Sequence, residues 1–298
     1  MASSPFYQHT LAGPAIFAGV GVHSGQHVRV SIRPAPAGAG ITFVRTDVTD
    51  RDNRIPARGD LVVQTQLGTV IGNDAGAKVS TVEHLMAAFA ALGVDNAVVE
   101  LDGPEVPIMD GSASPFVDII DRAGLRRQEA ARSYIEILET IEVTDQDKSA
   151  KLSPADQFEM SFQVKFDSKA IGHQSVDEVL DEAMFRAEFA DCRTFGFVEE
   201  VDALRAAGLA RGGSLNNVVV IEGDDILNPE GLRRDKEMVR HKAIDALGDL
   251  YLLGAPLLGR FEGIYSGHGV NNALVRALLE TPKAWRWTTL NETLAQAV

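Results

Sequence analysis

The 298-residue sequence predicts an α+β fold made of two similar units. Segments with strand-like alternation of apolar and polar residues open both halves, and segments with helical spacing follow them. In the first half, a helix ending in AALG precedes a strand, a loop containing MDGS and a second helix. In the second half, a helix ending in YLLG precedes a strand, a loop containing SGHG and a last helix. This repeated order indicates a duplicated unit, each a sheet covered by two helices.

The elements of the first unit follow from local pattern. Strand-like segments occupy 28–32, 41–44, 61–70 and 96–101. A helix is predicted to begin at Ser80, because Ser80 and Glu83 have the spacing of a capping box, and to end at Gly93. Ser114-Pro115 opens a second helix that runs to about Arg122.

The charged segment 124–133 lacks strand character and is predicted to separate two domains, 1–128 and 129–298. The second is expected to open with strands and to carry an inserted βαβ unit at about 197–220. Its predicted strands lie at 134–143, 158–166 and 259–264, and its helical segments at 176–189, 236–253 and 272–279. If the halves are duplicated, the functional site should lie between them, since pockets favour domain interfaces.

Charge and composition exclude several classes of protein. The net charge is −14, so a nucleic acid partner is not expected. Cys192 is the single cysteine, which rules out an internal disulfide. The first residues lack the features of a secretory signal, and no apolar run reaches the length of a transmembrane helix. We therefore expect a cytoplasmic protein; contact with a membrane surface stays open.

A polar stripe on the predicted long helix is the first candidate for chemistry. His241, Asp245 and Asp249 are spaced by four residues and lie along one side of it. A histidine followed four residues later by a carboxylate can bring two ligands to one metal. By spacing alone, a solvated helix face or a local hydrogen bond is the usual explanation of such a pair.

Glu83 and His84 could complete such a site. His84 would be a third protein ligand and Glu83 an adjacent base, as in a catalytic zinc site that keeps one position open. Each residue also has an ordinary interpretation, Glu83 as the return arm of the capping box and His84 as a surface or core histidine. The chain separation of 157 residues (241 − 84) leaves open whether the two clusters meet.

Further candidates lie in two short segments. Glycines on both sides of His268 suit a loop that presents it to a ligand, and Asp249 could orient its imidazole. Thr194 could stabilise an oxyanion, although a strand with two buried aromatic residues, Phe195 and Phe197, accounts for that segment. Lys242 could meet an anionic group.

Together these motifs resemble the UDP-3-O-acyl-N-acetylglucosamine deacetylases, the zinc amidases of lipid A synthesis. The resemblance extends from His9 to the last helix and rests on motifs that occur in the family's order: STVEHL at 80–85, IMDGSA at 108–113, CRTFGF at 192–197, VRHKAIDALGD at 239–249 and SGH at 266–268. It implies two βααβ-type domains packed through their helices, each with a small insert.

The resemblance also implies roles for individual residues. Zinc, one ion per chain, would be held by His84, His241 and Asp245. Glu83 would act as general base, and Thr194 would stabilise the oxyanion. The remaining catalytic roles fall to His268, which Asp249 holds as acid, and to Lys242.

The substrate would be an acylated UDP-amino sugar, and a monomer is expected. Phe166 would lie against uracil, and the insert would enclose the acyl chain, with Ala203, Leu204, Ala207 and Leu209 suited to that passage. The substrate-binding positions implied are Phe166, Phe195, Phe197, Glu200, Gly213 and Gly267.

Two features depart from the family's pattern. Lys165 stands where an acidic residue often precedes the aromatic residue, and the segment 68–78 is longer than usual. Two alternatives to the leading interpretation stay open. One is a zinc amidohydrolase of the same fold with another substrate, and the other is a non-catalytic protein that binds nucleotide sugar or lipid.

Overall fold

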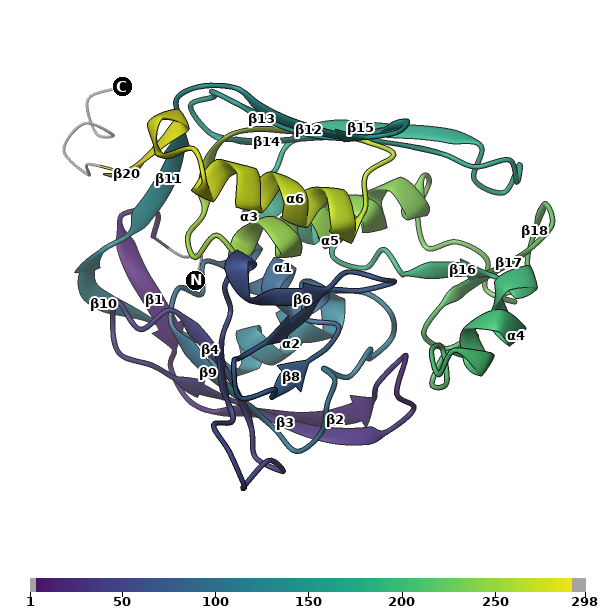
Figure 1. Ribbon diagram of the computed structural model, residues 1–298, viewed down its shortest axis with the longest axis horizontal. Coiled ribbons are helices and arrows are strands. Elements are labelled where there is room, and N and C mark those ends of the chain that lie inside the picture. Colours follow the sequence, from purple (N-terminus) through teal and green to yellow (C-terminus); the bar gives the residue numbers. More distant parts are fainter. Residues whose placement is uncertain (1–3, 291–298) are drawn as a thin grey trace.

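The computed structural model describes residues 4–290 and places helices between two sheets (Figure 1). From one side to the other, the layers are a five-stranded sheet, the helices α1 and α2, the helices α5 and α6, and a seven-stranded sheet. These helices span Glu83–Leu92 (α1), Ser114–Ala123 (α2), Glu237–Tyr251 (α5) and His268–Leu279 (α6). The α+β class predicted from the sequence is confirmed.

The first sheet has the order β2-β3-β9-β4-β5, with β4 and β9 parallel and the other neighbours antiparallel. Its strands are β2 Ala15–Val20, β3 His27–Pro34, β4 Ile41–Arg45, β5 Arg54–Pro56 and β9 Ala97–Leu101. In β3, Val28, Val30 and Ile32 are buried, as strand alternation requires when one face packs against helices. A separate three-stranded sheet joins β6 Val62–Gln64, β7 Val70–Gly72 and β8 Lys78–Val79.

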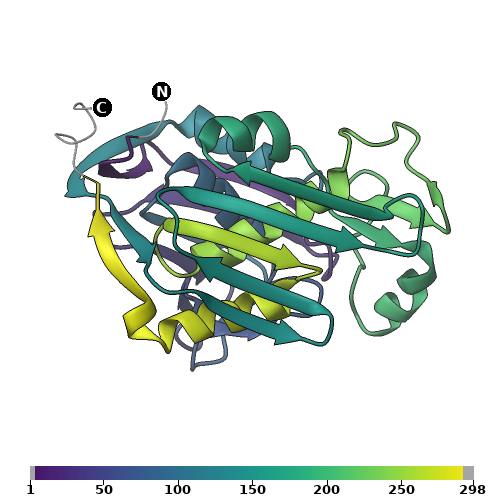
Figure 2. The same cartoon turned by 90° about the horizontal axis from the view of Figure 1, so that it is seen from above.

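The second sheet has the order β12-β13-β19-β11-β20, with β14 parallel to β19 and β15 antiparallel to β14. Figure 2 shows it from above, lying across the helices. Its strands are β11 Ser133–Ile137, β12 Ile141–Asp145, β13 Lys148–Ser153, β14 Phe158–Lys165, β15 His173–Val179, β19 Leu257–Ile264 and β20 Trp285–Thr289. In the chain, α5 and α6 lie on either side of β19, as α1 and α2 lie on either side of β9 in the first half.

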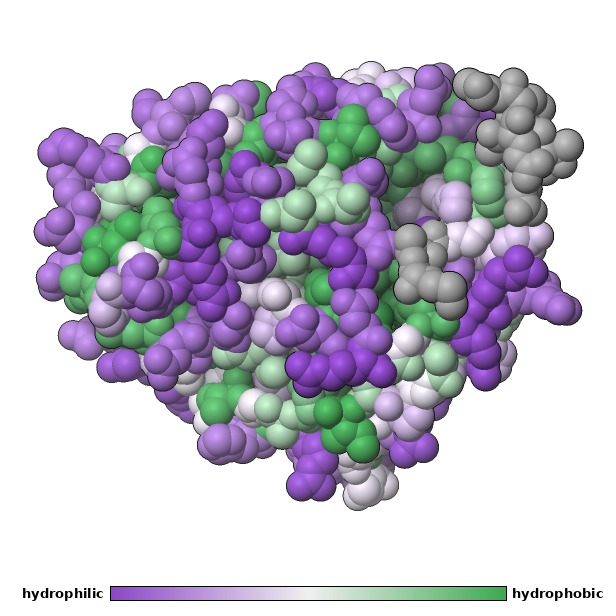
Figure 3. Space-filling model, turned by 180° about the vertical axis from the view of Figure 1, so that it is seen from behind, coloured by the Kyte–Doolittle hydropathy of each residue, from purple (hydrophilic) through white to green (hydrophobic). Residues whose placement is uncertain are grey.

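The insert is a βαβ unit, as predicted, and it projects from the layered body at the right of Figure 1. Its strands β16 and β17 pair in parallel and α4 connects them. The unit consists of β16 Phe195–Phe197, α4 Val198–Ala206, β17 Val219–Glu222 and β18 Asp225–Ile226. In the view from behind, polar residues cover much of the surface, and apolar residues form one patch at the left edge, the side of the insert, and others in the middle and lower part (Figure 3).

Three local predictions were wrong. The capping box at Ser80 does not form: α1 begins at Glu83, Val82 occupies the cap, and no side chain caps the helix. Thr81 has a φ of +58°, and this left-handed residue keeps Ser80 out of the helix. The segment 124–133, taken as a linker without strand character, contains β10 Leu125–Ala131, which pairs with β1 Tyr7–Leu11.

The third wrong prediction is the helix at 176–189, where the first part is β15. The chain turns helical only at α3, Glu182–Met184, and continues as the π-helix η2, Phe185–Phe189. Residues 173–179 form a strand because they pair with β14, and this pairing outweighs the helical spacing of the local sequence. Short 3₁₀ turns occur at Gly59–Leu61 (η1) and Pro282–Ala284 (η3). The division into domains 1–128 and 129–298 stays a prediction. Among the described residues, no helix has the length and apolar character needed to cross a bilayer.

A glycine lets α1 and α5 approach closely in the middle of the molecule. A Cβ atom built on Gly248 of α5 would lie 2.0 Å from the backbone oxygen of Glu83 at the start of α1. Any larger residue would push the helices apart. The contact brings the first turn of α1 against the polar stripe of α5, and this decides which side chains can meet.

Candidate metal and catalytic site

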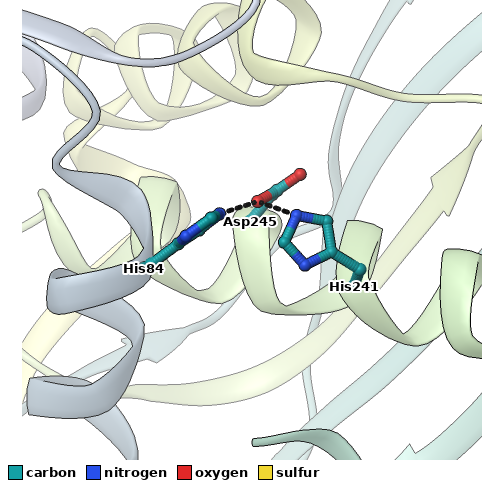
Figure 4. A group of neighbouring side chains, drawn as sticks. All are labelled: His84, His241 and Asp245. Carbon is teal, nitrogen blue, oxygen red and sulfur yellow. Dashed lines mark ion pairs between the residues drawn. The ribbon is translucent and has the colours of Figure 1, made fainter. Parts of the chain in front are cut away.

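His84, His241 and Asp245 converge between α1 and α5 (Figure 4). Nε2 of His84 and Nε2 of His241 each lie 3.3 Å from Oδ1 of Asp245. One potential ligand atom from each residue lies within 4.8 Å of the other two, and all three side chains are buried. The residues that the sequence suggested as metal ligands therefore do meet, although 157 residues separate the two histidines (241 − 84).

The hydrogen bonds around this group fit a bound cation. His241 Nδ1 lies 3.0 Å from the carbonyl oxygen of Cys192, so Nδ1 must donate and Nε2 keeps its lone pair. Oδ1 of Asp245 is buried and has no hydrogen-bond partner. A lone pair and an unpartnered carboxylate oxygen that face each other would repel, whereas a divalent cation between them would satisfy both. Two imidazoles and one carboxylate also match the ligand chemistry of catalytic zinc sites.

Charge states in the protein support the same arrangement. Burial lowers the pKa of His241 to about 4, so its imidazole is neutral at pH 7, the form that binds metals. Burial alone would raise the pKa of Asp245, but His241 and Lys242 hold it well below the usual range. Lys242 Nζ donates a hydrogen bond of 3.0 Å to Oδ2 of Asp245, the oxygen that the histidines do not face.

Glu83 points into the same space from the first turn of α1. Its carboxylate accepts a hydrogen bond of 3.0 Å from the backbone N–H of Thr69, and its Oε1 lies 3.9 Å from Nε2 of His268. Burial raises the pKa of Glu83. A raised pKa brings a carboxylate closer to the operating pH, where a general base works best. Because Glu83 does not cap α1, its carboxylate is available for chemistry.

His268, the first residue of α6, lies opposite Glu83. Its Nδ1 lies 2.9 Å from Oδ2 of Asp249, which also accepts a hydrogen bond from Asn271. Burial lowers the pKa of His268, but Asp249 outweighs this effect and raises it to about 9. The imidazole is therefore protonated at pH 7, with Nε2 directed between Glu83 and Asp245.

Thr69 was not among the residues predicted from the sequence, although it connects three of these residues. Its N–H bonds Glu83, and its hydroxyl donates to Oδ1 of Asp249 at 2.5 Å and lies 3.2 Å from His268 Nδ1. Thr69 belongs to the segment 68–78 that the sequence marked as long. No local pattern distinguishes a threonine in such a segment, so only the folded chain could reveal it.

A cavity of about 1160 Å³ opens over this group. Apart from the residues predicted for the acyl passage, Asp249 is the one predicted site residue outside its lining, since it lies behind His268. The predicted residues that do line the cavity are Glu83, His84, Phe166, Thr194, Phe195, Phe197, Glu200, Gly213, His241, Lys242, Asp245, Gly267 and His268.

Aromatic and apolar side chains line the part of the cavity next to the insert. Phe166 packs against Phe195 and Phe197, with ring centroids 5.6 Å apart in each pair. Leu204 of α4 faces the cavity, but Ala203, Ala207 and Leu209 do not belong to its lining. The predicted part of these three residues in a passage is therefore not supported: Ala203 lies on α4, and Ala207 and Leu209 follow its last residue. Lys165 also lines the cavity, beside Phe166.

Comparison with known proteins gives consistent matches along the chain. Residues 8–280 match the sequence model of a family described as UDP-3-O-acyl N-acetylglycosamine deacetylase. A protein of Phenylobacterium zucineum (strain HLK1) is 65% identical over 292 residues, 98% of this chain and 100% of that protein. Proteins of Anaeromyxobacter sp. (strain Fw109-5) and Myxococcus xanthus (strain DK1622) are 49% and 48% identical, over 94% and 96% of this chain and 90% of each relative. All three are named UDP-3-O-acyl-N-acetylglucosamine deacetylase.

Proposed function

The chain belongs to the UDP-3-O-acyl N-acetylglycosamine deacetylase family, and we propose that it hydrolyses the N-acetyl group of UDP-3-O-(3-hydroxyacyl)-N-acetylglucosamine. The reaction releases acetate and serves lipid A biosynthesis. One observation carries the catalytic part of the proposal: two imidazole Nε2 atoms face one unpartnered carboxylate oxygen, and a second carboxylate and a protonated histidine lie beside them.

We assign the metal as zinc, one ion per chain, with His84, His241 and Asp245 as ligands. When bound, it would supply a Lewis acid that polarises the amide carbonyl and lowers the pKa of water. The neutral state of His241 and the ionised state of Asp245 support this choice. The open side of the group faces the cavity, as a catalytic site requires.

Glu83 acts as the general base. Its buried carboxylate takes a proton from the attacking water, and the hydrogen bond from Thr69 N–H holds it in place. His268 carries a proton at pH 7 and passes it to the departing amine, with Asp249 maintaining its charge. Glu83 therefore acts as the base and His268 as the acid, each in the protonation state that its surroundings favour.

Thr194 and Lys242 stabilise the charge that develops on the carbonyl oxygen. The backbone N–H of Thr194 is bonded to the oxygen of Gly111 at 2.8 Å, which fixes the residue at the edge of the cavity. Because the main chain of Thr194 is held in this way, its hydroxyl group needs little reorganisation to donate a hydrogen bond during the reaction. Lys242 contributes positive charge while it remains hydrogen-bonded to Asp245.

The rest of the cavity provides for the nucleotide and the acyl chain. The phenylalanines at 166, 195 and 197 offer aromatic surface to the uracil ring. Apolar side chains of the insert, among them Leu204, Leu215 and Val220, offer a path for the acyl chain. Burial of each methylene group contributes about 0.8 kcal/mol, so the acyl chain should contribute strongly to binding.

The decisive experiment measures acetate release from this substrate together with the metal content of the purified protein. We expect about one zinc per chain, loss of activity after chelation, and recovery when zinc is added. Full activity in metal-free protein would contradict the mechanism. Equal turnover of UDP-N-acetylglucosamine, which lacks the acyl chain, would contradict the assigned substrate. The cytoplasmic location and the monomeric state stay predictions.

A further inference from the structure

A buried ion pair lies directly beside the site but outside its cavity. The side chain of Arg193 is 2% exposed and that of Glu237 is 0% exposed, with Nε and Oε1 2.9 Å apart. Neither residue lines the cavity, and the mechanism above uses neither. Removing two charges from water is costly, and apolar residues often serve stability equally well, so stability alone is a weak explanation for such a pair.

The pair connects two segments that both reach the site. Glu237 is the first residue of α5, one helical turn before His241. Its Oε1 accepts hydrogen bonds of 2.9 Å from both the backbone N–H and Nε of Arg193. The guanidinium also donates to Glu230 at 2.5 Å and to the carbonyl of Gly231 at 2.7 Å. Main chain and side chain of Arg193 are therefore both fixed to the start of α5.

The residues on either side of Arg193 each have a direct part in the site. The carbonyl of Cys192 accepts the Nδ1–H of His241 at 3.0 Å. Thr194 lines the cavity, and its backbone N–H is bonded to Gly111. Of these three consecutive residues, Cys192 orients the proposed metal ligand His241, Arg193 fixes the segment to α5, and Thr194 faces the cavity. The hydrogen bonds of Arg193 therefore fix the positions of Cys192 and Thr194 relative to α5.

We propose that Arg193 and Glu237 are positioning residues that set the tautomer and direction of the His241 imidazole and the place of Thr194. The inference rests on the proposed metal site. With the Cys192 carbonyl fixed, Nδ1 of His241 carries the proton and Nε2 faces Asp245. Loss of the hydrogen-bond partner that orients a metal-binding histidine typically lowers metal affinity by about 10–100-fold. Here the partner is a backbone carbonyl, so its position depends on what holds that backbone.

The test compares Arg193→Lys and Glu237→Gln with a matched control, Arg132→Lys. Arg132 forms another, largely buried ion pair with Asp95, at 2.8 Å and with side chains 8% and 12% exposed. It lies outside the lining of the site cavity. Each metal-free variant is titrated with Co²⁺, whose absorption spectrum reports the ligand geometry. Thermal unfolding of the same samples measures stability.

We expect Arg193→Lys and Glu237→Gln to bind Co²⁺ about 10–100-fold more weakly, with an altered spectrum. Arg132→Lys should lose stability but bind Co²⁺ as the parent does. Parental Co²⁺ affinity and spectrum in folded Arg193→Lys and Glu237→Gln would overturn the inference, as would an equal loss of affinity in the control. If the parent protein itself binds no Co²⁺, the proposed metal site fails, which is a distinguishable result.

A second measurement keeps the inference testable if one of the two variants does not fold. Correlations between ring nitrogens and protons in NMR spectra of metal-free protein report the tautomer of each histidine. The parent should show His241 protonated at Nδ1, and the variant that folds should show a mixture of tautomers. An unchanged His241 tautomer in that variant would overturn the inference. Lysine keeps the charge but not the planar fork of arginine, and glutamine keeps the shape but not the charge.

Discussion

The helix pair α1/α5 and the insert β16-α4-β17 surround one cavity but differ in burial. Thirteen of the fifteen residues of α5 are buried, whereas none of the nine residues of α4 is. The helix pair carries the residues proposed as metal ligands and as general base, together with Asp249, which is hydrogen-bonded to the proposed acid. The insert provides apolar and aromatic surface. Bond-making groups need placement within a fraction of an ångström, which close packing supplies, while an acyl chain needs only a surface of the right length.

The largest effect is expected from Glu83→Gln in the helix pair. Glutamine keeps an oxygen for the Thr69 N–H but cannot take a proton, so deacetylation should fall about 10²–10⁴-fold. Because Glu83 caps no helix, the unfolding temperature and the zinc content should stay near those of the parent. Activity assays, calorimetry and metal analysis check this. A variant that unfolds would show that Glu83 is mainly structural.

The protonated state of His268 predicts a specific dependence on pH. Its pKa is raised from 6.5 to about 9 in the folded protein, because Asp249 outweighs burial. The folded state therefore binds this proton more tightly than the unfolded state does. The resulting stability is fully present below about pH 6.5 and is lost as the pH rises through about 9.

Unfolding free energies of metal-free protein between pH 6 and 10 measure this contribution. In His268→Gln the loss of stability toward pH 9 should be absent. For the parent enzyme, turnover should fall about tenfold per pH unit above the pKa if His268 is the acid. Turnover that stays level to pH 10 would remove His268 from that role.

A glycine substitution tests the rigidity of the helix pair. Gly248→Ala places a Cβ 2.0 Å from the Glu83 backbone oxygen, so α1 and α5 must separate. We expect the unfolding free energy to fall by about 1–3 kcal/mol and metal affinity to fall with it. Gly196→Ala in the insert is the matched control, since its Cβ would meet only Val218 at 4.0 Å. Equal effects of the two changes would contradict the contrast between the two regions.

The smallest effect is expected in the insert itself. Leu204→Ala removes apolar surface from the cavity wall and should raise the KM of the acylated substrate by up to about tenfold, with kcat nearly unchanged. Turnover of UDP-N-acetylglucosamine, which lacks the acyl chain, should not change. Ala203→Ser on the same helix is the control, since Ala203 is exposed and outside the cavity lining. A loss of kcat in Leu204→Ala would mean that the insert also positions the reacting group.

Sequence alone determined the α+β class, the inserted βαβ unit and most helices, because these follow from local spacing of apolar residues. It was wrong at Ser80, at 124–133 and at 176–189, where a left-handed Thr81 and pairing with distant strands override local preference. Long-range pairing of this kind leaves little trace in a short window of sequence.

The candidate site was also predicted only in part from the sequence. Motifs identified His84, His241 and Asp245, but spacing alone could not bring residues 157 positions apart together (241 − 84). Only the tertiary structure decided that, through the close approach of α1 to α5 at Gly248. It also decided that Thr69 connects Glu83 to Asp249, and that Arg193 and Glu237 form a buried pair. Such contacts depend on where distant backbones cross, which no local pattern of side chains encodes.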